Sequence, residues 1–439
     1  MSPEIIGTIM LLLMVFVIFV GFPIAFTLLL LALVFGYIGL GNTVFYLMVF
    51  QTIGMMKEEI LAAVPLFIFM GYITEQSGLM ERLFRVLQLA MAPLRGSLYV
   101  AVILTATVFA MATGIVGAAV TVLGIMAAPI MIKSGYSPRL SAGAIAAGGT
   151  LGILIPPSVM IIVMAPVLGV SVVKLYAASF GPGFLLASLY IAYTLIRSYL
   201  NPEIGPAVPL ADRAKSYGEL VWAFLSGVLP LALLIACTLG SILAGLATPT
   251  EAASVGAFGA VLLGLAYRRL TLAGIKQAAI STLVTSSMVL FLAVASNVFG
   301  AVFARLGTAT VITNFLLGLP VPPFIMLLIV MAIIFILGWP FEWPAIVLVF
   351  LPIFYPIIAG LKYDPIWFGA LIAVNLQTAY LSPPVAMSAY YLRSVVPQWE
   401  LGTIYRGMAD FMIIQIIALL LVILFPPIAL WFPNWLFGN

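Results

Sequence analysis

The chain has 439 residues, of which 65% are hydrophobic and only 7% are charged, and its mean hydropathy is +1.29. These values exclude a soluble globular domain and indicate an integral membrane protein. The net charge of +4 comes from 17 basic and 13 acidic residues, mostly in short loops, so it bears on membrane orientation and gives no sign of nucleic-acid binding. With no histidine and one cysteine, the chain also excludes histidine metal sites, Ser-His-Asp triads and internal disulfides.

Apolar runs recur along the whole chain at lengths near the roughly 20 residues that cross a bilayer as a helix. They lack the alternation that is typical of an outer-membrane barrel. The expected fold class is therefore an all-α polytopic membrane protein with about 10–12 transmembrane helices plus two re-entrant helical hairpins. The predicted spans lie at 5–20, 24–40, 60–76, 98–132, 176–197, 220–243, 251–267, 283–303, 324–338, 344–360 and 410–432.

The first half of the chain contains two interruptions of its apolar runs. The run at 98–132 is broken by "MATGIVG", where Thr113 and Gly114 stand among apolar residues. Further on, "GGTLGILIPPS" places Pro156 and Pro157 in a strongly apolar part. Because proline lacks an N–H and clashes with the preceding turn, this pair predicts the end of one helix and the start of another.

The most polar stretch of the chain, at 197–219, is predicted to link two membrane repeats. The first repeat would cover 1–196, with a hairpin at about 140–165, and the second 220–439, with a hairpin at about 366–392. Early in the second repeat, "TPTE" predicts a capping box in which Thr248 is the N-cap and Glu251 the third helical residue.

The second half contains a matching pair of interruptions. The segment "GWPFEWP" includes Glu342, a carboxylate with apolar flanks, and "NLQTAYLSPPV" carries a second proline pair, Pro383 and Pro384. An ionisable group at membrane depth costs several kcal/mol unless it is paired or functional, so Glu342 is a candidate for binding a cation or carrying a proton. The alternative is an interfacial residue at a helix end, which the neighbouring tryptophans favour.

A shift of 227 positions relates these features of the two halves. It superimposes the two proline pairs, matches a Tyr-x-Pro at Tyr363 with the one at Tyr136, and places Glu342 opposite Ile115. Two copies with hydrophobic segments interrupted at matching positions indicate a secondary transporter, in which such breaks form substrate and ion sites near the bilayer midplane. The absence of a GxSxG elbow and of a phosphate-binding loop is consistent with transport rather than hydrolysis.

The chemistry available at the two tips is that of oxygen ligands. Backbone carbonyls freed by the breaks must face protein, water or a cation, and the tips add hydroxyl and amide groups. Such ligands suit a hard cation such as sodium, while a helix N-terminus favours an anionic substrate. The alternative is a pair of proline kinks without a ligand. The polar tip residues are Thr150, Ser158, Asn375, Gln377, Thr378 and Ser382.

Several motifs, in order, resemble the large membrane subunit (DctM type) of tripartite ATP-independent periplasmic (TRAP) transporters. They are "AVPLFIFMG", "GGTLGILIPPS", "GLATPTEAA", "LPIFYPI" and "NLQTAYLSPPV". The resemblance covers nearly the whole chain. It implies an inverted-repeat fold of the ion-transporter type with scaffold and transport domains, in the cell inner membrane, and a function that is not enzymatic.

The resemblance also implies partners and coupling ions. Members of this family use a sodium gradient, a small membrane subunit (DctQ type) and an extracytoplasmic binding protein (DctP type) that delivers an organic acid. No cofactor other than the coupling sodium ions is expected. Lipid is the expected surrounding, and nucleic acid is not an expected partner.

Carried over by position, the family's first sodium site would use Thr113, Gly149, Gly152, Ile155 and Pro157. The second would use Glu342, Leu376, Gln377, Thr378, Leu381 and Pro383. The full set expected to bind substrate or ions adds Gly114, Thr150, Pro156, Ser158, Asn375, Ser382 and Pro384.

The sequence therefore supports one main hypothesis and one alternative. The main hypothesis is a sodium-coupled, binding-protein-dependent permease that imports a small organic anion, expected to be a carboxylate, by an elevator mechanism. The alternative keeps the fold but makes the chain a stand-alone or proton-coupled carboxylate symporter with Glu342 as the proton carrier. A lipid-modifying membrane enzyme is disfavoured because the chain lacks histidine and clustered carboxylates.

Overall fold

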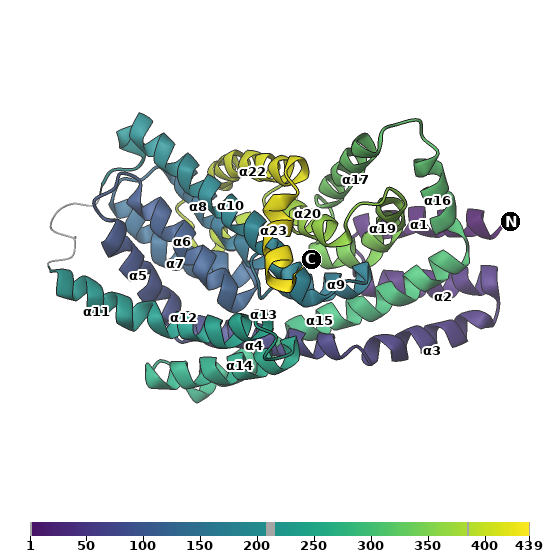
Figure 1. The fold of residues 1–439 in the computed structure, drawn as a ribbon, viewed down its shortest axis with the longest axis horizontal. Coiled ribbons are helices and arrows are strands. Elements are labelled where there is room, and N and C mark those ends of the chain that lie inside the picture. Colours follow the sequence, from purple (N-terminus) through teal and green to yellow (C-terminus); the bar gives the residue numbers. More distant parts are fainter. Residues whose placement is uncertain (1, 208–215, 384–385, 439) are drawn as a thin grey trace.

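The computed structural model describes residues 2–207, 216–383 and 386–438, and in these ranges all regular structure is helical (Figure 1). Eight helical segments are long and apolar enough to cross a membrane: Glu59–Gln76, Val116–Lys133, Val172–Leu200, Leu220–Leu243, Pro249–Ala266, Leu272–Arg305, Trp343–Gly360 and Leu401–Leu424. Several shorter helices are also apolar. The predicted all-α polytopic class is confirmed.

The first half of the chain folds into ten α-helices. Two of them, α8 and α9, are separated by the 3-10 turn η2 (Leu151–Ile153) and the first proline pair. The helices are α1 (Pro3–Phe19), α2 (Ile24–Leu40), α3 (Thr43–Met56), α4 (Ala63–Gln76), α5 (Leu79–Met91), α6 (Ser97–Thr113), α7 (Val116–Lys133), α8 (Pro138–Thr150), α9 (Val159–Leu168) and α10 (Val172–Leu200).

The second half contains the remaining helices. Two π-helical turns, at Ala236–Gly240 and Ile346–Phe350 (η6), and the 3-10 turn η7 (Thr378–Tyr380) interrupt them. The helices are α11 (Tyr217–Gly227), α12 (Leu229–Ile235), α13 (Ser241–Leu243), α14 (Pro249–Ala266), α15 (Leu272–Arg305), α16 (Thr308–Leu317), α17 (Pro323–Leu337), α18 (Trp343–Ala345), α19 (Leu351–Gly360), α20 (Pro365–Gln377), α21 (Met387–Val395), α22 (Leu401–Leu424) and α23 (Pro427–Phe437).

The 227-residue offset recurs in the helix boundaries. Helix α8 ends at Thr150 and α20 ends at Gln377, two residues 227 positions apart, and both helices begin at a proline. Proline suits the first helical position because its missing N–H has no partner there in any case. In α20 the N-cap Asp364 also accepts hydrogen bonds from the backbone N–H groups of Ile366 and Trp367. The matching starts follow from matching sequence signals, while the division of the chain at 197–219 stays a prediction.

The break expected in the run at 98–132 is confirmed, because Gly114 adopts a left-handed conformation (φ 62°) there and separates α6 from α7. The predicted span at 410–432 is wrong as a single helix, because it is divided after Leu424, where two prolines separate α22 from α23. Short helices such as α3 and α16 lie between the predicted spans. The capping box is confirmed, because Thr248 and Glu251 make both of its reciprocal hydrogen bonds.

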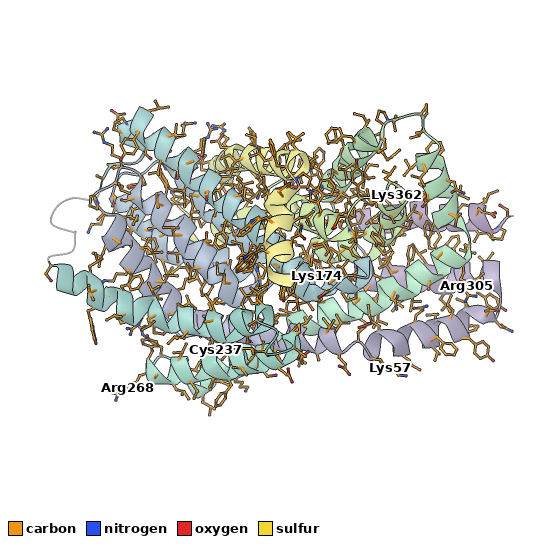
Figure 2. All side chains as sticks on the ribbon, in the orientation of Figure 1. Lys57, Lys174, Cys237, Arg268, Arg305 and Lys362 are labelled. Atoms are coloured by element: carbon orange, nitrogen blue, oxygen red, sulfur yellow. The ribbon has the colours of Figure 1, made fainter. Side chains whose placement is uncertain are left out.

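Packing between distant parts of the chain forms the core. The long helix α15 runs beside α2 and α3 at one end of the molecule, α14 lies against α4, and α22 lies against α8 (Figure 1). The basic residues labelled in Figure 2 lie at or near helix ends, for example Lys57 directly after α3 and Arg305 as the last residue of α15. The interior is therefore left to apolar and uncharged polar side chains.

The start of the predicted linker is attached to the first half. Helix α10 continues to Leu200, inside the stretch expected to link the repeats. Beyond it, the hydroxyl of Tyr99 donates a hydrogen bond to the carbonyl of Ile204, and the hydroxyl of Tyr136 donates one to the carbonyl of Pro206 (2.7 Å). The residues after 207 fall outside the described ranges until 216.

Candidate functional site

The interruptions of the two halves open onto one cavity of about 370 Å³. The break after α6 contributes its wall together with the break before α18, and each hairpin tip contributes one or two residues. Helices α4 and α15 form another part of the wall. Its described lining residues are Ile68, Tyr72, Glu75, Gly114, Ile115, Val116, Gly117, Ala118, Thr121, Ile153, Val159, Thr285, Met288, Val289, Glu342, Trp343, Pro344, Tyr380 and Tyr391.

The first break lies directly against the first hairpin tip. A Cβ atom at Gly114 would lie 3.0 Å from the carbonyl oxygen of Pro157, and one at Gly149 would lie 2.3 Å from a methyl carbon of Val120. Gly152 faces the same break, because its Cβ would lie 3.6 Å from the backbone nitrogen of Ile115. Glycine is therefore required at Gly114 and Gly149, whereas Gly152 makes only an ordinary contact. The structure brings Gly149, Gly152 and Pro157 of the predicted first site against the break at Gly114 and the start of α7.

The second break lies against the second tip in a corresponding way. A Cβ atom at Gly338 would lie 3.1 Å from the Cβ atom of Ala379 in η7. The amide of Asn375 donates a hydrogen bond to the carbonyl of Met331 in α17 (2.8 Å), which ties α20 to the helix before the break. Glu342 is the N-cap residue of α18, where its extended backbone (φ −76°, ψ 160°) directs the chain into the helix. Its exposed side chain belongs to the cavity lining.

Two predicted tip residues lie away from the cavity, at a junction between the hairpins. The hydroxyl of Thr150 is 3.4 Å from the amide oxygen of Gln377, and the amide nitrogen of Gln415 in α22 is 3.4 Å from each of them. All three side chains are fully buried. Their polar groups therefore serve contacts between α8, α20 and α22.

The other predicted tip residues satisfy hydrogen bonds within their own hairpin. The hydroxyl of Ser158 donates to the carbonyl of Ile153 (2.6 Å) and caps α9. In the second hairpin, Thr378 donates to the carbonyl of Asn375 (2.6 Å), and Ser382 donates to the carbonyl of Thr378 (2.5 Å).

The remaining predicted residues differ in burial. Those fully or almost fully buried at the tips are Ile155, Pro156, Pro157, Leu376 and Leu381, whereas Pro383 is exposed. Pro384 lies outside the described residues, and Thr113 is described only as the last residue of α6, without its side chain.

The sequence reasoning missed a second carboxylate of the cavity. Glu75, near the end of α4, lines the cavity and is half-buried. One turn earlier, the hydroxyl of Tyr72 forms a hydrogen bond with that of Thr285 in α15 (3.1 Å), so the two facing helices are joined next to Glu75. The available signal was the one used for Glu342, since Glu75 is the only charged residue of an apolar helix.

The cavity also contains a source of positive potential. Helix α7 begins at Val116 without a side-chain cap, and Val116, Gly117 and Ala118 in its first turn line the cavity. The first N–H groups of a helix have no partner within it and carry a partial positive charge, so they favour an anion. Among the described lining residues there is no lysine or arginine. An anionic group in this cavity thus has only backbone, hydroxyl and indole donors.

The sequence as a whole matches one family of membrane transporters. Residues 10–428 match the family model described as "Tripartite ATP-independent periplasmic transporter, DctM component". The chain is 31% identical over 379 residues to the C4-dicarboxylate TRAP transporter large permease protein DctM of Pseudomonas aeruginosa, covering 86% of each chain. It is 29% identical over 425 residues to the sialic acid TRAP transporter large permease protein SiaM of Vibrio cholerae, covering 96% of each.

A third relative has a longer chain. The isethionate TRAP transporter permease protein DctMQ of Oleidesulfovibrio alaskensis is 28% identical over 373 residues, which are 84% of this chain but only 57% of that protein.

Two solved structures share the fold at low sequence identity. The Alcanivorax borkumensis YdaH transporter has a TM-score of 0.65 at 16% identity, covering 100% of this chain and 99% of that one. Neisseria gonorrhoeae MtrF has a TM-score of 0.60 at 17% identity, covering 90% and 85%. These two structural similarities support the fold, whereas the family model and the sequence relatives support the assignment to a transporter family. The chain therefore belongs to the DctM family of TRAP transporters, as a multi-pass large permease subunit of the inner membrane and not as an enzyme.

Proposed function

We propose that this permease imports a small organic anion, a carboxylate, by a sodium-coupled elevator mechanism. The observation that carries the proposal is the convergence of both breaks and both hairpins on one cavity, which contains the uncapped N-terminus of α7. A volume of about 370 Å³ suits a small molecule rather than a polymer. Interrupted helices that meet in this way are the usual construction of substrate sites in secondary transporters.

Sodium is the coupling ion of this proposal, carried as cargo rather than held as a cofactor. The first site would consist of oxygens around Thr113, Gly149, Gly152, Ile155 and Pro157, and the close approach of Gly114 to the Pro157 carbonyl supports it. The second would combine Glu342 with the tip at Leu376, Gln377, Thr378, Leu381 and Pro383. Carbonyl and carboxylate oxygens are the ligands that a hard cation prefers.

The two walls of the cavity support a moving and a fixed part. One wall comes from the breaks and the hairpins, and the other from α4 and α15, which are joined through Tyr72 and Thr285. In the proposed mechanism the hairpins and broken helices move as a body along α4 and α15, so the cavity opens to alternate sides of the membrane.

The proposal includes two partner proteins. A small DctQ-type membrane subunit would bind the permease, and a DctP-type binding protein would deliver the substrate from outside. The longer DctMQ relative supports a small subunit, because this chain covers only 57% of its length.

Uptake by proteoliposomes that contain the permease, its small subunit and its binding protein tests the proposal. We expect accumulation of the binding protein's ligand only when an inward sodium gradient is imposed. Uptake that is indifferent to the sodium gradient would contradict the coupling, and uptake without the binding protein would contradict the proposed delivery.

A proton-coupled symporter that uses Glu342 is the second candidate. It is favoured by the exposure of the Glu342 side chain to the cavity, where no hydrogen bond or ion pair is found for it in the described part of the chain. The substitution Glu342→Gln separates the two candidates. A proton carrier should lose pH-driven uptake completely, whereas a sodium ligand should mainly shift the sodium concentration required for half-maximal uptake.

A further inference from the structure

The cavity holds a carboxylate to which the proposed sodium sites give no role. Glu75 lines the cavity from α4, whereas Glu342 and the two breaks line it from other elements. Among the described residues no hydrogen bond or ion pair is found for it, and no basic side chain lines the cavity. A half-buried carboxylate without a partner is unfavourable unless a positive group joins it.

Aromatic rings also line the cavity. Tyr72, Tyr380, Tyr391 and Trp343 all line the cavity, and they come from four different elements. The face of an aromatic ring attracts an ammonium group, and several rings around one space are the usual construction for binding alkylated ammonium. The cavity is lined by these rings and by two carboxylates, Glu75 and Glu342 of the proposed sodium site, and no lysine or arginine is among its described lining residues. The space at Glu75 therefore suits a cation rather than an anion.

The start of α7, unlike Glu75, favours a negatively charged group. The residues of its first turn, Val116, Gly117 and Ala118, line the cavity, and the unpaired N–H groups at a helix start attract a carboxylate. A single ligand that satisfies both regions must carry one negative and one positive group. A dicarboxylate would instead place its second negative charge against Glu75.

We propose that the substrate of this cavity is an amino carboxylate, whose carboxylate lies at the N-terminus of α7 and whose ammonium group lies at Glu75 in this aromatic-lined cavity. This inference rests on the proposed function, because it takes the cavity as the substrate site. Among the carboxylates of that proposal, it selects those that also carry an ammonium group. The hydrogen bond between Tyr72 and Thr285 holds the wall that carries Glu75, one turn before it.

Binding of matched compounds to the permease with its small subunit in lipid nanodiscs tests the proposal. Each pair has the same skeleton with and without the positive charge: L-alanine and L-lactate, 4-aminobutyrate and 4-hydroxybutyrate, glycine betaine and 3,3-dimethylbutyrate. We expect at least one zwitterion to bind at least about tenfold more tightly than the paired compound that lacks the ammonium group. This is the size of effect expected for a desolvated charge pair.

Substitution at Glu75 assigns that preference to the carboxylate. Glu75→Gln should remove the preference for the zwitterion over its partner compound, while Glu75→Asp should retain part of it. Glu81→Gln, on the exposed face of α5 outside the cavity, is the matched control and should change nothing. The apparent melting temperature of each variant without ligand identifies any that fails to fold, and Glu75→Asp then provides the comparison.

Three results would overturn the inference: equal binding of both members of every pair, no binding of any zwitterion, or a preference that persists in Glu75→Gln. Sodium-driven uptake in proteoliposomes is a separate measurement. Sodium-driven uptake of a hydroxy acid, equal to that of its amino partner, would contradict this inference and leave the proposed function intact. Zwitterion uptake without sodium dependence would contradict the coupling alone.

Discussion

The two hairpins follow the same backbone path but are packed by different means. In the first, the residues before the tip are glycines, and the backbone of α8 approaches α7 where Gly149 meets Val120. In the second, the position corresponding to Gly149 is the buried Leu376, and its neighbour Asn375 makes a hydrogen bond to the carbonyl of Met331. The first hairpin therefore packs through the absence of side chains at its glycines, whereas the second packs through the side chains of Asn375 and Leu376.

The ends of the two tips differ as well. Helix α9 starts with a capped turn, in which Ser158 accepts a hydrogen bond from the N–H of Ile161. Helix α21 starts at Met387, and its N-cap residue Ala386 has a positive φ of 24° and provides no side-chain cap. The helical segment after the second break contains the π-helical turn η6, whereas α7, after the first break, is α-helical throughout. The two hairpins therefore share an order of elements, but each has its own interactions.

The largest effect is expected from Gly149→Ala, which adds a side chain where the first hairpin has none. The new Cβ would lie 2.3 Å from a methyl carbon of Val120 and 3.1 Å from its backbone nitrogen, which cannot rotate away. We expect a loss of stability of about 3 kcal/mol, the upper part of the range for overpacking. The midpoint of thermal unfolding of the purified permease would fall, and uptake would fall with it.

Gly402→Ala is the matched control for that substitution. Gly402 lies in helix α22, and a Cβ there would meet no atom within 4 Å. Since alanine favours a helix over glycine, this variant should be as stable as the parent or slightly more stable. Equal melting temperatures for the two variants would contradict the view that the first hairpin depends on the absence of a side chain.

A smaller loss is expected from Asn375→Ala in the second hairpin. The change removes the donor to the Met331 carbonyl, a buried hydrogen bond of 2.8 Å, and should cost about 1–2 kcal/mol. The exposed Asn314 in α16 offers a control, because Asn314→Ala should have almost no effect. A melting temperature for Asn375→Ala that equals the control's would show that the second hairpin does not depend on this amide.

The hairpins were predictable because their signals are local. A proline pair ends one helix and begins another wherever the surroundings allow it, so Pro156 and Pro157 mark the gap between α8 and α9. The same signal was present at Pro426 and Pro427, but the prediction of a single span at 410–432 did not use it. Gly114 marked the break between α6 and α7, although the sequence alone did not give its left-handed conformation.

The contribution of α4 and α15 to the cavity was not predictable in the same way. Glu75 stands near a helix end, where a carboxylate usually faces water, and its place in the cavity lining depends on how α4 packs against α15. The sequence alone presents the amide of Gln377 as a candidate ion ligand and gives Gln415 no role. Their contact with Thr150 exists only because three distant helices meet.

The smallest effect is expected where the two hairpins touch. Thr150 and Gln377 occupy corresponding positions, 227 residues apart, and their side chains meet at 3.4 Å. Thr150→Val and Gln377→Leu each remove one partner while keeping a similar shape. Because the contact is long, a double-mutant cycle on unfolding should give a coupling of only about 0.5–1 kcal/mol.

That coupling would distinguish a joined pair of hairpins from two independent ones. Thr150→Val combined with Ser382→Ala is the control cycle. The hydroxyl of Ser382 donates to the carbonyl of Thr378 in its own hairpin, and no hydrogen bond joins it to Thr150 among the described residues, so these effects should add. If both cycles add, the hairpins are not held together through this junction, and the amide of Gln415, 3.4 Å from both side chains, does not join them either. If only the first cycle couples, the junction binds one hairpin to the other, and a motion of either tip must carry both, as the elevator proposal requires.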